Sequence, residues 1–346
     1  MLRKDKFLYV EWIITFGCNY TCNYCFYGYE NLRKHAYMFR QRGPRLPKSF
    51  LEEKLFPIAR QLGVFKYADS IRNYPLSRWL GFFDYVSEYR RDLYLSLTGG
   101  EPFLLRREIG TLVRHLSEKF ETLKVRVDTN GSIIPSFGSE FKGYLSFNVS
   151  YHPTQVSRDE LLKNLDALSA CGAVLMVNRV VGPTEMVGVL DEIEYFRQRG
   201  YYLNVNPTDF NLAEYSPEAR EVLSAVRSEI DVSLPMLGQT AGRSCEYPSF
   251  GMQLLPSGYA WIPPCDDKAV EVIRQPANFH KLLKKDMYAC PGKCVCFHQY
   301  PWVAGGYNDI DIMKEFVERN KRWRATHLPL HGVGDVSKPN TVATSL

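Results

Sequence analysis

The first two-thirds of the chain alternates short apolar runs with amphipathic stretches. The apolar runs are rich in Val, Ile, Leu and Tyr, a composition typical of strands in a parallel sheet that is covered on both faces. They predict six strands, at Tyr9–Phe16, Leu93–Leu97, Leu123–Asp128, Leu145–Ser150, Val174–Val180 and Leu203–Asn206.

The stretches between these runs predict helices. Ser157 and Glu160 form a capping-box pattern before a helical periodicity of leucines, and Gly172 ends that helix. Ser49 and Glu52 repeat the pattern, although Pro57 should shorten or kink the helix that follows. Amphipathic patterns and a Ser-Pro start signal predict three more helices, over Arg106–Phe120, over Glu185–Arg199 and from Ser216-Pro217 onward.

Six β/α repeats in succession predict an α/β fold, a partial (β/α)6 TIM-like barrel, with a doubly wound sheet as the competing arrangement. The alternation of predicted strands and helices ends after Asp209. Gly, Pro and Cys become frequent there and predict a small cysteine-rich α+β domain. We therefore expect three parts: a barrel over 1–210 with an insertion at about 30–90, a second domain over 211–326, and a flexible tail over 327–346.

Composition fits a folded globular protein, since 45% of the 346 residues are hydrophobic and 23% are charged. The net charge of +5 is too small to imply a nucleic-acid partner, although it allows an anionic substrate. No apolar run approaches the ~20 residues of a membrane helix. Glu11 interrupts the apolar start Phe7–Phe16, which therefore predicts a buried strand rather than a signal peptide. These features predict a cytoplasmic protein with no membrane partner.

The chain has nine cysteines, and eight of them fall in two tight groups. An odd total, close spacing and no secretion signal argue against a disulfide framework and for metal binding. Cys171 stands alone before the fifth predicted strand, where we expect a buried structural thiol.

The first group is Cys18-Asn-Tyr-Thr-Cys22-Asn-Tyr-Cys25, directly after the first predicted strand. Three thiolates in this C-x3-C-x2-C spacing can hold three irons of a cubane cluster and leave the fourth open for a small ligand. The alternative is a zinc site that takes its fourth ligand from elsewhere, but zinc motifs usually contain C-x2-C pairs.

A second motif, Thr98-Gly99-Gly100-Glu101-Pro102, follows the second predicted strand. Two glycines allow the backbone to approach a ligand closely, and a carboxylate neutralises an ammonium group. The alternative for this segment alone is a tight turn.

Together the two motifs resemble the radical S-adenosylmethionine (SAM) superfamily. The resemblance implies a 4Fe–4S cluster on Cys18, Cys22 and Cys25, with SAM bound to its open iron. It places Tyr24 near the adenine and the methionine amino group of SAM at Gly99, Gly100 and Glu101.

The resemblance also suggests SAM contacts at the ends of later strands. Asn130 and Ser150 are the candidates, and Arg179 is a candidate partner for the SAM carboxylate. Each of these side chains has a plainer alternative, which is to cap a loop. His152 is a candidate for proton donation or substrate binding, and a structural histidine is the alternative.

The second cysteine group lies late in the chain. The segment from Cys245 to Cys265 predicts a β-hairpin with its turn at Pro256–Gly258. Together with the later cysteines Cys290, Cys294 and Cys296, this segment resembles the SPASM and Twitch extensions of radical SAM enzymes, which hold auxiliary 4Fe–4S clusters. Structural zinc is the alternative. A single Twitch-like cluster needs four ligands, and the five candidates are Cys245, Cys265, Cys290, Cys294 and Cys296.

The implied activity is reductive cleavage of SAM to a 5′-deoxyadenosyl radical that removes a hydrogen atom from the substrate. We expect an oxidative modification, a dehydrogenation or a cross-link, of a peptide or small biosynthetic metabolite. A flavodoxin or ferredoxin would supply the electron. One alternative in the same class is an epimerase or another redox-neutral modification of a sugar or peptide. Outside the class, the alternatives are a zinc-binding interaction protein and a nucleic-acid-modifying factor, the latter suggested by a pI of 8.6 and the basic stretch Arg33–Arg45.

Overall fold

The computed structural model describes residues 7–22, 25, 69–137, 141, 143–186, 188–201, 203–207, 215–226, 244–245, 247–262, 269–283 and 288–289. They divide into two compact units. The first unit draws on ranges 1–148, 152–175 and 237–295, and the second on 149–151, 176–236 and 296–346. The chain crosses from one unit to the other within two strands.

The strands form a mixed sheet in the order β10-β9-β8-β1-β2-β3-β4-β5-β6. All six strands expected from the apolar runs are confirmed. Five are longer than predicted by one or two residues at one or both ends, and the first begins two residues earlier than predicted and ends one residue earlier. In the described residues they are β1 Phe7–Thr15, β2 Asp92–Gly99, β3 Thr122–Thr129, β4 Tyr144–Tyr151, β5 Val174–Val181 and β6 Leu203–Pro207.

Strand β1 lies at the centre of the first unit. It pairs in parallel with β2 on one side and with β8 (Gly251–Leu254) on the other, and β2 pairs in parallel with β3. Every residue of β1 except Glu11 is buried. A strand paired on both edges and covered on both faces needs a nearly continuous apolar run, which explains the sequence of β1.

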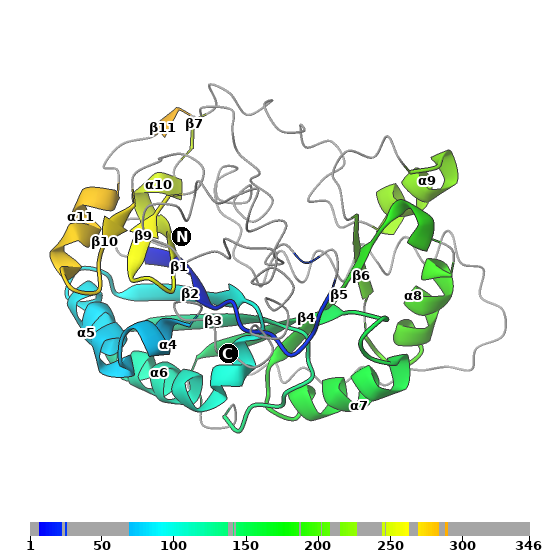
Figure 1. Ribbon diagram of the computed structural model, residues 1–346, viewed down its shortest axis with the longest axis horizontal. Helices are drawn as coiled ribbons and strands as arrows, with labels where there is room; N and C mark the ends of the chain where they lie inside the picture. The colour runs from blue at the N-terminus through cyan, green and yellow to red at the C-terminus, as the bar shows by residue number, and fades with distance from the viewer. Residues whose placement is uncertain are drawn as a thin grey trace, which may run out of the picture. The chain divides into compact units, whose positions relative to one another are not determined.

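Two helices, α5 (Leu76–Ser87) and α6 (Arg106–Lys119), pack against the parallel strands of the first unit, as Figure 1 shows. Their apolar stripes are fully buried. The four-residue helix α4 (Ser70–Asn73) precedes them, and Ser70 Oγ accepts a 2.9 Å hydrogen bond from Nε1 of Trp12. The rings of Trp12 and Trp79 lie 4.5 Å apart, so this corner of the core joins β1, α4 and α5.

The predicted hairpin is confirmed as β8 and β9 (Tyr259–Trp261), which are antiparallel. Its turn closes with Gly258 at a φ of +81°, a conformation that favours glycine. The hairpin continues the sheet through β10 (Val270–Glu271). The short elements around it are β7 Ser244–Cys245, α10 Tyr247–Phe250, η4 Pro276–Asn278, α11 Phe279–Leu282 and β11 Tyr288–Ala289. The boundary expected near residue 210 stays a prediction.

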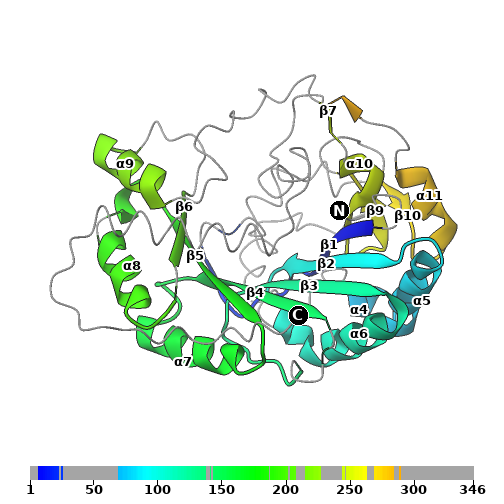
Figure 2. The same cartoon turned by 180° about the vertical axis from the view of Figure 1, so that it is seen from behind.

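The predicted helix after Ser157 is confirmed as α7 (Arg158–Ser169). Ser157 is its N-cap, and its Oγ accepts the backbone N–H of Glu160 at 3.2 Å. Gly172 adopts a φ of +75° just beyond the end of the helix. Figure 2 shows α7 from behind, with α5 and α6.

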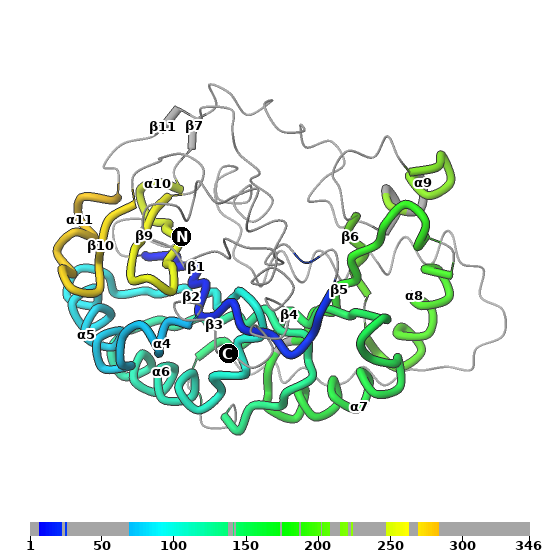
Figure 3. The backbone as a smooth tube through the Cα atoms, viewed as in Figure 1, coloured from blue at the N-terminus to red at the C-terminus, as the bar shows by residue number. Residues whose placement is uncertain are grey.

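The second unit contains β5, η2 (Pro183–Glu185), α8 (Val189–Arg197), β6 and α9 (Pro217–Val226), which the tube in Figure 3 follows. The helix expected over Glu185–Arg199 begins only at Val189. A 3-10 turn and Gly188, with a φ of +84°, precede it, and a left-handed residue cannot continue a helix. Ser216 caps α9 as predicted, since its Oγ accepts the backbone N–H of Ala219 at 3.1 Å.

No helix within the described residues is long and apolar enough to cross a membrane.

Candidate functional site

The cysteine loop begins where β1 ends. Thr15 Oγ1 accepts the backbone N–H of Gly17 at 2.9 Å, which turns the chain out of the strand. Cys18 is buried, whereas Cys22 and Cys25 are partly exposed, and none of these three described cysteines is in a disulfide. The N–H of Cys25 bonds the carbonyl of Cys22 at 3.3 Å. The loop therefore presents one buried and two accessible sulfurs.

The Gly99-Gly100-Glu101 segment is tied to this loop by two short backbone hydrogen bonds. Gly100 donates to the carbonyl of Thr15, and Glu101 donates to the carbonyl of Gly17, both at 2.7 Å. A Cβ on Gly99 would lie 2.1 Å from the oxygen of Thr15, and one on Gly100 would lie 1.9 Å from the oxygen of Gly17. The two motifs thus meet, and both glycines are required by contact between the two loops.

The side chain of Glu101 points into the protein and is completely buried. Its Oε1 accepts hydrogen bonds from the N–H of Phe103 at 2.9 Å and from Thr129 Oγ1 at 2.8 Å, and its Oε2 accepts the N–H of Asn130 at 2.7 Å. Burial raises the pKa of this carboxyl to about 7, against the lowering effect of the hydrogen bonds. The carboxylate therefore joins the end of β2 to the end of β3.

Asn130 carries the connection on to the cysteine loop. Its Nδ2 lies 3.8 Å from Sγ of Cys18 and donates to Oδ1 of Asn19 at 2.9 Å. Ser132 donates to Asn130 Oδ1 from its N–H at 3.0 Å and its Oγ at 2.6 Å. Asn19 closes the ring, because its Nδ2 donates to Ser132 Oγ at 2.8 Å. Asn130 was expected near the site, whereas Asn19, which lies inside the cysteine motif, and Ser132, two residues after Asn130, were not.

A loop after β4 borders the cysteine loop within the first unit. The rings of Tyr20 and His152 lie 5.9 Å apart at right angles, and the N–H of Thr21 donates to Gln155 Oε1 at 3.3 Å. Burial, and then the charge of Glu160, raise the pKa of Tyr20 to about 12, so its phenol stays protonated at neutral pH. The structure thus brings His152 beside the candidate site.

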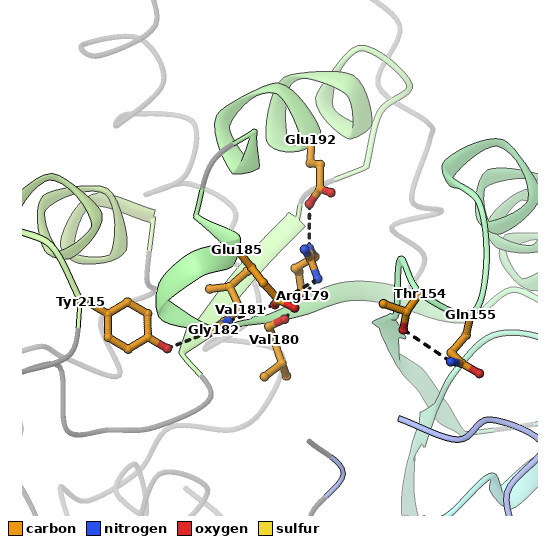
Figure 4. Close-up of polar contacts among 9 residues, drawn as sticks. All are labelled: Thr154, Gln155, Arg179, Val180, Val181, Gly182, Glu185, Glu192 and Tyr215. Carbon is orange, nitrogen blue, oxygen red and sulfur yellow. Dashed lines mark hydrogen bonds and ion pairs between the residues drawn. The ribbon is translucent and has the colours of Figure 1, made fainter. Parts of the chain in front are cut away.

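Two further candidates, Ser150 and Arg179, belong to the second unit. Figure 4 shows the surroundings of Arg179, whose Nε donates to Oε2 of Glu192 at 2.8 Å. Its Nη1 donates to the carbonyl of Val180 at 3.2 Å and lies 4.0 Å from Oε2 of Glu185. The guanidinium is therefore held by carboxylates of its own unit, and its pairing with SAM stays a prediction.

Three asparagines share one face of the β5–β6 pair in the second unit. Asn178 Oδ1 accepts from Nδ2 of Asn204 at 2.6 Å and from Nδ2 of Asn206 at 3.4 Å. The opposite face carries Leu203 and Val205, both fully buried. The three side chains therefore form a connected amide cluster.

The remaining candidates lie outside the described residues. They are Tyr24, Cys265, Cys290, Cys294 and Cys296. Cys245 is placed by its backbone alone, in β7, where it pairs with Tyr288 of β11. Among the residues that the structure describes, no group of three or more His, Cys, Asp or Glu side chains is gathered tightly enough to hold one metal ion.

Cys171, expected as a structural thiol, is half-buried rather than fully buried. Its Sγ contacts the carbonyls of Ala167 at 3.7 Å and Pro135 at 3.9 Å. Burial raises the pKa of this thiol, which favours its protonated form.

No protein-family model matches the chain. Native anSMEcpe with bound AdoMet, which is SAM, is similar over 92% of this chain and 97% of its own, at 14% identity and a TM-score of 0.48. Native anSMEcpe with AdoMet and the Cp18Cys peptide is similar over 91% and 97%, at 16% identity and a TM-score of 0.43. BtrN in complex with AdoMet and 2-DOIA is similar over 92% and 87%, at 13% identity and a TM-score of 0.29.

Proposed function

We propose that this protein is a radical SAM enzyme whose 4Fe–4S cluster is held by Cys18, Cys22 and Cys25. One observation carries the proposal: the three-cysteine loop and the Gly-Gly-Glu segment are joined by two 2.7 Å backbone hydrogen bonds. A cluster-binding loop and a ligand-binding backbone segment are thereby held side by side. When bound, the cluster and SAM supply reductive carbon–sulfur cleavage and hydrogen-atom abstraction, chemistry that no side chain provides.

The donor set of the loop fits such a cluster. None of the three is in a disulfide, and Sγ of Cys18 accepts the N–H of Tyr20 at 3.4 Å and an N–H of the Asn130 amide at 3.8 Å. Hydrogen bonds of this kind are what cluster-ligating thiolates receive in proteins. Three cysteines supply one ligand to each of three irons, so they need not converge on a single ion.

The strand order supports a partial (β/α)6 barrel over a doubly wound sheet. Strands β1 to β6 follow one another in chain order, whereas a doubly wound sheet reverses its order at a switch point. The cysteine loop, Gly99–Glu101 and Asn130 all follow the carboxyl ends of their strands, where active sites of β/α barrels lie.

We assign the SAM amino group to the backbone of Gly99, Gly100 and Glu101, because the Glu101 carboxylate already has three internal donors. Further SAM contacts are proposed at Tyr24, Asn130, Ser150 and Arg179. His152, which borders the cysteine loop, is proposed to face the substrate.

An auxiliary 4Fe–4S cluster is proposed on four of Cys245, Cys265, Cys290, Cys294 and Cys296. Such a centre can accept an electron from a substrate radical. The proposed net reaction is therefore an oxidation, a dehydrogenation or a cross-link, of a peptide or small metabolite, with flavodoxin or ferredoxin as the electron donor.

The test is anaerobic purification and reconstitution, iron and sulfide counting, and then dithionite and SAM with 5′-deoxyadenosine measured by chromatography. About four irons per chain indicate one cluster and about eight indicate two. Replacing Cys18, Cys22 and Cys25 by Ala should abolish 5′-deoxyadenosine, whereas Cys171→Ala, the matched control, should retain it. A colourless protein that carries zinc and cleaves no SAM would overturn the proposal.

A further inference from the structure

One side chain next to the cysteine loop has its orientation fixed from several directions. Asn130 is buried, and its Oδ1 accepts the backbone N–H of Ser132 at 3.0 Å. A backbone N–H can only donate, so the other end of the amide must be Nδ2. That end faces Sγ of Cys18 at 3.8 Å and Oδ1 of Asn19 at 2.9 Å. Contacts within the protein therefore orient the Asn130 amide N–H toward the Cys18 sulfur.

The backbone of the same residue is anchored independently. Its N–H donates to Oε2 of Glu101 at 2.7 Å, and the same carboxylate accepts from Thr129 Oγ1 at 2.8 Å. The Asn19–Asn130–Ser132 ring holds the side chain at its other end. Main chain and side chain are therefore both fixed, which limits how far Asn130 can move relative to Cys18.

Cys18 is the buried thiol of the three, so a hydrogen bond to its sulfur acts in a low dielectric. A cluster gains negative charge when it is reduced, and N–H donors to its sulfurs stabilise that added charge. A donor held in place before reduction loses no free energy in reorganising.

We propose that Asn130 is a positioning residue that raises the reduction potential of the cluster through its amide contact with Cys18. This inference rests on the proposed radical SAM function and deepens it. Asn130 acts through the cysteine, which makes the first electron transfer easier, and this role does not require contact with SAM. Tyr20, through its backbone N–H, adds a second donor to the same sulfur that no side-chain substitution removes.

The test compares reconstituted wild type with Asn130→Leu and Asn130→Asp by redox titration followed by electron paramagnetic resonance. Leu removes the amide without adding charge. Asp keeps the size of the side chain and the oxygen that accepts from Ser132, but it has no amide N–H to donate to Cys18. The titrations use a Cys245→Ala, Cys265→Ala background, and the signal that changes on adding SAM identifies the cluster at Cys18. Both variants should have a midpoint more negative than wild type, by more than the spread of repeat titrations.

The matched control is Asn148→Leu, which removes a partly buried amide that bonds Asp128 Oδ1 at 2.8 Å, on the same sheet. Its midpoint should equal that of wild type. An unchanged midpoint in Asn130→Leu, with wild type still forming 5′-deoxyadenosine, overturns this inference alone. A wild type that takes up no cluster overturns the proposed function as well. If neither Asn130 variant folds, the residue is structural only and the inference is wrong.

Discussion

The carboxylate of Glu101 accepts the backbone N–H of Asn130 at 2.7 Å, across the ends of β2 and β3. Glu101 is also held by its own N–H, which donates to Gly17 of the cysteine loop. The end of β1, the end of β2 and the end of β3 are thus linked through one residue. Substitutions here should therefore affect both stability and the candidate site.

Glu101→Gln should change how stability depends on pH. Burial raises the pKa of Glu101 from 4.5 to about 7, so the folded state binds this proton more tightly than the unfolded state. The resulting stability is present below pH 4.5 and is lost as the pH rises through 7. The shift corresponds to about 3 kcal/mol.

Urea unfolding of the metal-free protein between pH 4.5 and 8 measures this effect. Wild type should lose stability relative to Glu101→Gln over that range. Glu118→Gln, at an exposed position of α6, should run parallel to wild type. Parallel pH profiles for wild type and Glu101→Gln would contradict the assignment.

Gly100→Ala should destabilise the protein strongly, because the added Cβ would lie 1.9 Å from the backbone oxygen of Gly17. Backbone atoms of two paired loops must separate to admit it, at a cost of roughly 3 kcal/mol or more. Gly81→Ala is the matched control, since its Cβ meets nothing within 4 Å in helix α5. That control should gain about 0.5–1 kcal/mol in urea unfolding. Equal effects of the two substitutions would rule out the close approach.

Ser70→Ala should leave the buried indole N–H of Trp12 without its acceptor. The expected cost is about 1–3 kcal/mol of unfolding free energy, followed by tryptophan fluorescence in urea. Ser117→Ala removes a hydroxyl that donates locally to the Arg114 carbonyl at 2.7 Å on the exposed face of α6, and it should change stability by less than about 0.5 kcal/mol. A neutral Ser70→Ala would show that Trp12 finds another acceptor.

Arg179→Met should destabilise the second unit. It leaves the carboxylate of Glu192, which lies 2.8 Å from Nε, without its cation. Because Glu192 is only partly buried, losing this charged hydrogen bond should cost about 1.5–3 kcal/mol. The exposed Arg199, which stacks 3.8 Å above the ring of Tyr195, is the control, and Arg199→Met should cost less than about 1 kcal/mol. Similar unfolding free energies for the two variants would contradict the expected difference between the Arg179–Glu192 ion pair and the exposed Arg199–Tyr195 contact.

Most strands were predictable because they are short and mainly apolar, and β3 because its residues alternate between buried and less buried positions. The starts of α7 and α9 followed from their Ser caps, whereas nothing in the sequence showed that Gly188 would delay α8 to Val189. The meeting of the cysteine loop, through Thr15 and Gly17, with Gly100 followed from two parallel strands ending at one edge. The inward turn of the Glu101 side chain did not, because it depends on donors from Phe103 and Thr129 that only the fold brings together.

The pairing of β8 with β1 could not be predicted either, because the sequence pattern of a hairpin does not indicate which strand the hairpin will join. That pairing has a consequence for how the chain matures. Within the described residues one side of β1 pairs with Gly251–Leu254, so we expect that side to lack this partner during synthesis until residue 254 has emerged. An open apolar strand edge is a template for other chains. We therefore expect the β8–β9 hairpin to protect the edge of β1 from aggregation. A chain truncated before Gly251 would keep that edge exposed.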